Sequence, residues 1–312
     1  SHRSAQGDIT ICPRSAANGN GRLGGGMMFA RKHMNIDTLE LLQLTSNRLI
    51  GQSVAILGIK GSGKSNTAAV LMEELLDAGI PVTIVDIAGE YHSLKANYPH
   101  ITVIGRSIYG DVVEIPLTRE NTEQVAATAY TNGSSVVIDV SGVYEEDSRD
   151  QLLAIYFGTV WRQALQRRIP AVIFLEEAHN YIPQRGRTGV RDLFTRIAAE
   201  GRQWGLSLVI VSQRSARIDK DVLTQADIAF MHKVRHPTDM KLYTDIIPRQ
   251  ARWVRERVNG LKAGEALVLV GDQVLRCQMR LRHTQHVGAT PTMKNLPQQL
   301  PLFDLWQEGR ES

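Results

Sequence analysis

The chain has 312 residues, of which 43% are hydrophobic and 22% charged, and its formal net charge is +4. This mixture excludes a largely disordered chain and allows one large α/β domain or two small ones. Cys12 and Cys277 are far apart, which argues against a disulfide framework or a zinc site and favours the cytoplasm. Because no apolar run reaches the roughly 18 residues that cross a bilayer, we expect no membrane contact.

In chain order the sequence divides into three parts. Residues 1–33 are rich in Gly, Asn, Ser and Arg, which predicts a flexible arm. Residues 34–290 are predicted to form the main domain, and residues 35–49 have helical apolar spacing at its start. Residues 291–312, with their prolines and the apolar LPLFDLW, are predicted to be an extended tail.

Apolar strands and amphipathic helices alternate through the main domain. We predict helices over 63–79, 147–168, 190–203 and 237–262. We predict strands over 53–58, 81–89, 100–105, 112–117, 134–143, 171–182, 206–214, 226–234, 265–272 and 274–282. This alternation indicates an α/β fold with a mostly parallel sheet, helices on both faces and a closing β-hairpin formed by the last two strands.

The run GIKGSGKSN, residues 58–66, lies between a predicted strand and a predicted helix. It fits the phosphate-loop pattern G-x-x-x-x-G-K-[ST]. Its glycines let backbone N–H groups turn toward phosphates, and the helix N-terminus adds partial positive charge. Lys64 would reach the β and γ phosphates, and Ser65 would supply a hydroxyl to Mg²⁺. We therefore predict a site for ATP and Mg²⁺ formed by Gly58, Lys60, Gly61, Ser62, Gly63, Lys64, Ser65 and Asn66.

The predicted strand VIFL ends in two carboxylates, Glu176 and Glu177. A carboxylate at the end of a strand beside the phosphate loop can hold the shell of Mg²⁺, and a second can orient the attacking water. We assign Glu176 to the metal and Glu177 to water activation. The alternative is that both are solvated residues at a strand end.

Three further polar residues are candidates for the same site. Gln213 ends the strand LSLVIVS and could sense the γ-phosphate, or it could be a surface amide. Asp86 ends another strand, where ligands collect in open α/β sheets, although a structural carboxylate fits equally well. Arg202, in AAEGRQWG, could stabilise charge during phosphoryl transfer from a neighbouring subunit, or it could form a surface salt bridge.

The ordered motifs resemble the HerA branch of the FtsK–HerA ATPases. The resemblance rests on LEEAHNYIP, EGRQWGLSLVIVSQR, IDKDVLTQADIAF, VDIAGEY and GEALVLVGD, and it extends from about residue 35 to residue 295. It implies a RecA-like core that assembles into a hexameric ring, hydrolyses ATP between subunits and moves DNA through a central pore. It also implies that Glu177 is the catalytic glutamate, Gln213 the sensor, and Arg202 the arginine acting on the neighbouring site.

The sequence departs from that family in two ways. A glycine-rich arm stands where archaeal HerA helicases have a barrel domain, and Glu176 occupies a position that is usually Asp in phosphate-loop enzymes. The loop PQRGRTGVR carries Arg185, Arg187 and Arg191. In a ring it could line the pore with positive charge and contact DNA phosphates through Arg185 and Arg187, or it could be a solvated loop.

These observations favour an ATP-hydrolysing, DNA-translocating ring motor. An alternative is a nucleotide-controlled scaffold for a partner effector, such as a nuclease or an NAD-consuming enzyme in antiphage defence, with the apolar tail as a docking strip. A DNA-packaging or conjugation pump shares the motor's mechanism. No helix-turn-helix, zinc module or aromatic platform is visible in the sequence, so sequence-specific DNA recognition is not expected.

Overall fold

A computed structural model describes residues 8–10, 43–45, 49–186 and 188–285. Its main feature is a ten-stranded sheet with the strand order β12-β11-β10-β3-β9-β8-β4-β7-β5-β6. The strands of this sheet are β3 (Ser53–Leu57), β4 (Val82–Asp86), β5 (Thr102–Gly105), β6 (Ile115–Pro116), β7 (Val136–Asp139), β8 (Ala171–Leu175), β9 (Leu206–Ser212), β10 (Ile228–Met231), β11 (Glu265–Val270) and β12 (Gln273–Gln278).

All neighbouring strands from β10 to β6 pair in parallel, whereas β11 and β12 pair antiparallel. The predicted parallel sheet and its closing hairpin are therefore confirmed. The strand β3 lies between β10 and β9, with Val54 opposite Ile228 and Val209. Every residue of β3, β8 and β9 is buried, as expected for strands covered on both faces.

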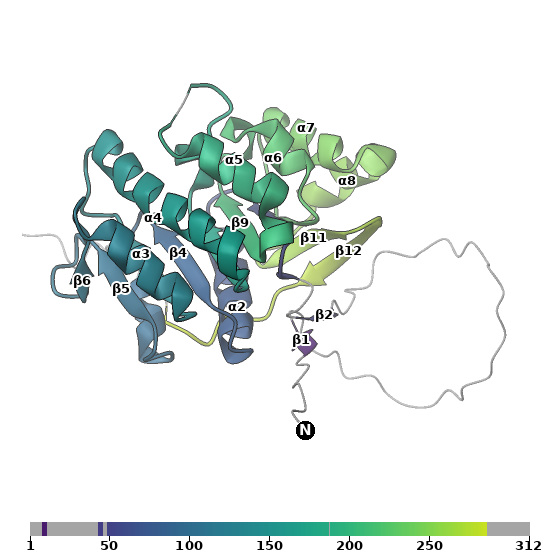
Figure 1. Ribbon diagram of the computed structural model, residues 1–312. Coiled ribbons are helices and arrows are strands. Elements are labelled where there is room, and N and C mark those ends of the chain that lie inside the picture. Colours follow the sequence, from purple (N-terminus) through teal and green to yellow (C-terminus); the bar gives the residue numbers. More distant parts are fainter. Residues whose placement is uncertain (1–7, 11–42, 46–48, 187, 286–312) are drawn as a thin grey trace, which may run out of the picture.

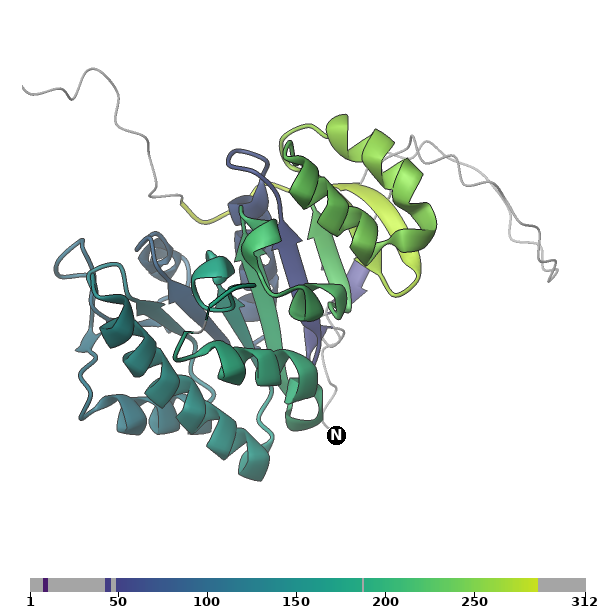
Figure 2. The same ribbon diagram turned by 90° about the horizontal axis from the view of Figure 1, so that it is seen from above.

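Helices cover both faces of the sheet (Figures 1 and 2). One apolar core contains side chains of α3 (Thr122–Thr131), α4 (Glu146–Arg167), α5 (Arg191–Glu200), α6 (Lys220–Thr224), α7 (Pro237–Ile246) and α8 (Ala251–Asn259). The second core, on the other face, contains side chains of α2 (Lys64–Asp77) and of the short helix η1 (Tyr91–Ala96). Side chains of β3 alternate between these cores, because Ala55 and Leu57 face the first and Val54 and Ile56 the second.

The C-terminal end of the described chain is fastened to α2. Glu73, whose side chain is fully buried, accepts hydrogen bonds from the Arg280 guanidinium (2.6 Å) and from the Thr284 backbone N–H (2.9 Å). The Arg280 guanidinium also binds the Glu74 carboxylate at 2.8 Å. The segment after β12 therefore crosses α2 rather than leaving the domain directly.

The structure differs from the sequence prediction in several elements. The predicted strand 171–182 ends at Leu175, because the chain turns at Glu177 (φ 48°) and forms the short helix η2 (Ala178–Asn180). Within the segment 35–49, for which helical spacing was predicted, Gln43–Thr45 is a strand (β2) that pairs antiparallel with β1 (Asp8–Thr10), which lies in the predicted arm. The predicted helical segment 237–262 is divided into α7 and α8, because Pro248 cannot continue the hydrogen bonding of α7. The helices α3 and α6 were not predicted. Of the helices in the described part of the chain, none has the length and apolarity to cross a membrane.

Candidate functional site

The phosphate loop connects the end of β3 to the N-terminus of α2. Its turn requires positive φ angles at Gly61 (77°) and Gly63 (108°). A Cβ atom at Gly63 would lie 2.8 Å from the backbone of Gly264, so a side chain cannot be accommodated there. The loop is tied to its neighbours by the N–H of Gly264, which donates to the Ser62 carbonyl at 2.9 Å, and by the Ile59 N–H, which donates to Lys233 at 3.0 Å.

A buried histidine lies beneath this loop. His232 follows β10, and its Nδ1 lies 2.9 Å from the Glu265 carbonyl oxygen while its Nε2 lies 2.9 Å from Thr67 Oγ1. A Cβ atom at Gly58 would come within 2.6 Å of His232 Cβ. The imidazole therefore fills the space under the loop and determines how closely β10 and the loop approach.

The loop forms the floor of a cavity of about 540 Å³ at the carboxyl ends of β3, β8 and β9. Its lining combines the phosphate loop with the two strand-end glutamates: Lys60, Gly61, Gly63, Lys64, Ser65, Asn66, Ala88, Glu90, Glu176, Glu177 and Gln213. Burial lowers the pKa of the Lys64 ammonium, whereas the negative charges of Glu176 and Glu177 oppose that shift. An ammonium beside two carboxylates is the arrangement that the sequence motifs predict.

The two glutamates lie in different environments. Burial raises the pKa of Glu176 to about 8, and the charge of Glu177 acts in the same direction; the Tyr91 hydroxyl donates to Glu176 at 3.1 Å. Glu177 is half-buried with a positive φ of 48°. Burial would raise the pKa of Glu177, but His179 at 3.2 Å, together with the Gln213 N–H and the charge of Lys64, holds it below its usual range.

The donor set in this cavity fits Mg²⁺. The Ser65 hydroxyl and the Glu176 carboxylate are oxygen ligands of the kind this cation prefers. Glu176 is buried beside a second carboxylate, so its ionised form requires a nearby cation. The residues predicted to bind the metal are therefore chemically suited to it.

Two of the predicted nucleotide-binding residues are already engaged in the fold. The Asn66 side chain lines the cavity, but its amide donates to the Arg280 carbonyl at 2.7 Å and accepts from the Arg282 N–H at 3.0 Å. Asp86 is fully buried and is not among the residues that line the cavity in the described structure. Its carboxylate accepts the backbone N–H groups of Gly89 at 2.8 Å and Tyr91 at 2.7 Å, so we favour its structural role.

Arg202 lies near the amino end of β9, at the opposite end of the strands from the cavity that Lys64 lines. It belongs to the turn η3 (Gly201–Trp204) that precedes β9, and it lines a different cavity of about 450 Å³ with Gln52 and Asp227. The seven-residue strand β9 separates it from Gln213, a span of roughly 20 Å. A Cβ atom at Gly51 would meet Arg202 Cα at 3.1 Å, so the arginine backbone is held closely against the start of β3.

The predicted basic loop is only partly available for an anion. Arg191 forms a salt bridge with Asp219 at 2.6 Å and donates to the Gly186 carbonyl at 2.9 Å, so it braces the loop. Arg185 is exposed and lines a separate cavity of about 570 Å³. Arg187 lies outside the described residues.

Sequence reasoning missed His179 and His232. His232 follows an apolar strand with no motif around it, so only the three-dimensional contacts show its position under the loop. His179 is two residues after Glu177 in LEEAH, and this spacing at the end of a strand was the signal that could have identified it as a neighbour of the carboxylate.

Comparison with known proteins agrees with this geometry. Residues 37–152 match the family of "Helicase HerA, central domain". The DNA double-strand break repair helicase HerA of Saccharolobus solfataricus is 29% identical over 305 residues, covering 69% of this chain and 61% of the relative. The protein of the same name from Sulfolobus acidocaldarius is 21% identical over 311 residues, covering 70% and 62%. The chain thus spans less than two thirds of the length of these relatives.

A solved structure shares the fold. The genome packaging NTPase B204 from Sulfolobus turreted icosahedral virus 2, in complex with AMPPCP, is 19% identical and superposes with a TM-score of 0.51. The match covers 73% of this chain and 98% of the viral protein. At this identity the likeness shows a shared fold and does not transfer a function.

Proposed function

Since this chain belongs to the HerA central-domain family through residues 37–152, we propose that it is an ATPase that assembles into a ring and moves DNA through the central pore. The family resemblance favours a hexameric ring. The proposal combines the phosphate-loop cavity with the basic loop after β8. The scaffold alternative receives no separate support, because the apolar tail that would dock an effector lies outside the described residues. The pump alternative shares the motor's mechanism and is not distinguished from it.

One observation supports the proposal: the predicted catalytic residues are divided between the two ends of the strands. Lys64, Glu177 and Gln213 line one cavity, whereas Arg202 lies at the other end of β9. An exposed arginine at that distance cannot reach a nucleotide bound by its own chain. It can reach a nucleotide bound by a neighbour if the amino ends of the strands in one subunit face the phosphate-loop cavity of the next subunit, as a head-to-tail ring allows.

The proposed chemistry assigns one task to each side chain. Lys64 neutralises charge on the β and γ phosphates, and backbone N–H groups of the loop bind their oxygens. Glu177 accepts a proton from the attacking water, and Gln213 contacts the γ-phosphate. Bound Mg²⁺, held by Ser65 and Glu176, would neutralise charge that develops on the phosphate oxygens. Arg202 of the neighbouring subunit would stabilise the same charge.

The test is steady-state ATP hydrolysis by the size-fractionated oligomer with and without DNA, with single-stranded and duplex substrates compared. Strong stimulation by DNA that is absent in Lys64→Ala and Glu177→Gln supports the motor. Slow hydrolysis that is indifferent to both DNA substrates contradicts it and favours the scaffold.

A further inference from the structure

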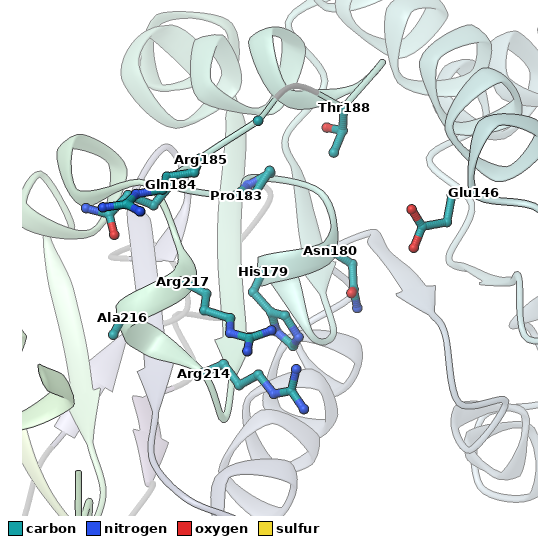
Figure 3. A pocket seen from close by; sticks show the side chains of 11 residues that line it. Glu146, His179, Asn180, Pro183, Gln184, Arg185, Thr188, Arg214, Ala216 and Arg217 are labelled. Atoms are coloured by element: carbon teal, nitrogen blue, oxygen red, sulfur yellow. The ribbon is translucent and has the colours of Figure 1, made fainter.

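A cationic cavity lies beside the ATP cavity, between the turn after β8 and the turn after β9 (Figure 3). Its volume is about 570 Å³, and its basic side chains are Arg185, Arg214, Arg217 and His179. In Figure 3 Arg214, Arg217 and His179 lie near one another, and Glu146 stands apart from them. Among the described residues, none of the three guanidinium groups has a salt-bridge partner. Unneutralised cations around one space attract an anion.

The turn that carries Arg214 and Arg217 is fixed by the fold. The buried carboxylate of Asp239, on α7, accepts the Ser215 hydroxyl at 2.6 Å and the Ala216 N–H at 3.0 Å. The carbonyl of Arg217 accepts the Gln184 N–H at 2.7 Å, which joins this turn to the turn after β8. The cavity therefore has a rigid backbone frame, and its arginines start from fixed positions.

His179 forms the wall between this cavity and the catalytic glutamate. Its Nδ1 lies 3.2 Å from Glu177 Oε2 and 3.2 Å from Ser212 Oγ. Because Nδ1 faces a carboxylate, it carries the ring proton and donates it to Glu177. The Ser212 hydroxyl oxygen also accepts the Arg214 N–H at 3.0 Å. One short chain of contacts therefore connects the cationic cavity with Glu177.

We propose that this cavity binds a phosphodiester group of DNA and that His179 transmits its occupancy to Glu177. The inference rests on the proposed function and extends it to regulation of the same site. Arg214 and Arg217 would bind the phosphate oxygens, and His179 is a positioning residue that acts through Glu177.

The proposed switch exchanges hydrogen-bond partners. Without DNA, Glu177 Oε2 accepts from His179 and from the Gln213 N–H, which lies 3.4 Å away. These two donors occupy the carboxylate oxygen that would otherwise orient the attacking water. A phosphodiester in the cavity offers the imidazole a second charged acceptor, so His179 turns toward it. Glu177 then loses one donor, and its Oε2 becomes available to a hydrogen bond from the attacking water.

The arginines are tested with the double variant Arg214→Gln, Arg217→Gln in the full chain. Oligonucleotide affinity is expected to fall at least about tenfold, and the slope of log affinity against log salt to fall by about two. The matched control Arg119→Gln, Arg255→Gln removes the same charge from exposed positions outside the cavity. Equal effects in the two double variants would overturn the assignment.

A free anion is distinguished from DNA by adding inorganic phosphate in place of the oligonucleotide. Orthophosphate is expected to leave the rate of ATP hydrolysis unchanged or to inhibit it as a product. If orthophosphate alone stimulates hydrolysis as strongly as DNA, the ligand is a free oxyanion and the phosphodiester assignment is wrong.

His179 is tested by His179→Ala and by His179→Asn, whose amide can still donate to Glu177. The alanine variant is expected to hydrolyse ATP about three- to tenfold faster without DNA, with a stimulation ratio near one, and the asparagine variant to restore the wild-type ratio. A slower alanine variant with an unchanged ratio would make His179 merely structural. If wild-type hydrolysis ignores DNA, the proposed function itself fails; if only the ratios of the variants are unchanged, this inference alone fails.

Discussion

Thr67 Oγ1 lies 2.9 Å from Nε2 of His232, and both side chains are fully buried beneath the phosphate loop. Since Nδ1 of the same ring donates to the Glu265 carbonyl, Nε2 is bare and accepts the threonine hydroxyl. This hydrogen bond requires a neutral ring. The support of the phosphate loop is therefore coupled to the protonation of a single histidine.

The first prediction concerns stability at acidic pH. Burial lowers the pKa of His232 to about 4, and the nearby charge of Lys64 acts in the same direction. Between the unfolded pKa near 6.5 and about 4, the unfolded state binds the extra proton, so stability rises with pH across this window. His232 contributes its stability above about pH 6.5 and loses up to about 3 kcal/mol as the pH falls toward 4.

Urea unfolding at several pH values measures this term. His232→Gln cannot be protonated, so its free energy of unfolding should change less steeply between pH 6.5 and 4 than that of the wild type, even if it is less stable throughout. The exposed His100, changed to Gln, is the control and should keep the wild-type slope. Parallel curves for all three proteins would show that His232 is not the titrating group.

The second prediction concerns the division of the site between subunits. Arg202→Ala and Lys64→Ala should each form inactive homo-oligomers. In equimolar mixed rings, an interface that joins the intact loop of one variant to the intact arginine of the other is complete. Random mixing produces such interfaces in about a quarter of cases, so up to about a quarter of wild-type ATP hydrolysis should return.

The control for the mixing experiment replaces Arg202→Ala with the double variant Lys64→Ala, Arg202→Ala. Mixed with Lys64→Ala, it leaves every interface without a lysine, so hydrolysis should stay absent. Recovery in this control, or no recovery in the first mixture despite subunit exchange, would place Arg202 outside the catalytic machinery.

The third prediction separates binding from chemistry. Glu177→Gln removes the base and keeps the size of the side chain, so kcat should fall by about 10²–10⁴, while ATP affinity stays within about threefold because the Lys64 contacts remain. A fluorescent nucleotide analogue measures the affinity. Glu120→Gln, at a fully exposed position, should change neither quantity. A kcat that stays within threefold of wild type would transfer the role of base to another residue.

The fourth prediction concerns the clamp between Glu73 and Arg280. Glu73 is fully buried and accepts hydrogen bonds from Arg280, His283 and Thr284. Glu73→Leu would leave the guanidinium and two backbone N–H groups without their acceptor, so the free energy of unfolding should fall by about 3 kcal/mol or more. Glu74→Leu, at a more exposed partner of the same arginine, should lower it by about 1 kcal/mol. Equal losses would contradict the clamp.

Most of the sheet was predictable because its strands are buried on both faces. Runs such as VAIL and AVIFL are wholly apolar, and the glycine-rich turn after β3 marks the point where the strand ends and α2 follows. The helix α3 was missed because its apolar residues are mostly alanines, whose weak periodicity hides a packed face. The strand at Gln43–Thr45 was missed because it is only three residues long.

The site could be predicted only where one segment carries a whole motif. Glu176 and Glu177 directly follow β8, and Lys64 and Ser65 begin the helix after the loop that follows β3. Since β3 and β8 both pair in parallel with β9, these residues lie at the same end of the sheet. The engagement of Asn66 and Asp86 was not predictable, since their partners depend on where the chain after β12 crosses α2 and how the turn after β4 closes. The cationic cavity needs two turns that lie more than 25 residues apart, joined by Gln184 and Arg217.

The clamp on α2 also determines how a mechanical force would travel. The Asn66 amide and the Glu73 carboxylate lie about two turns apart on α2. Both form hydrogen bonds with the segment 280–284. Tension applied at Gln285 is therefore borne by α2 before it reaches the hydrogen bonds of β12. Since α2 begins at Lys64, the same helix connects that pull to the phosphate loop, so tension on the segment 280–284 would be transmitted to Lys64.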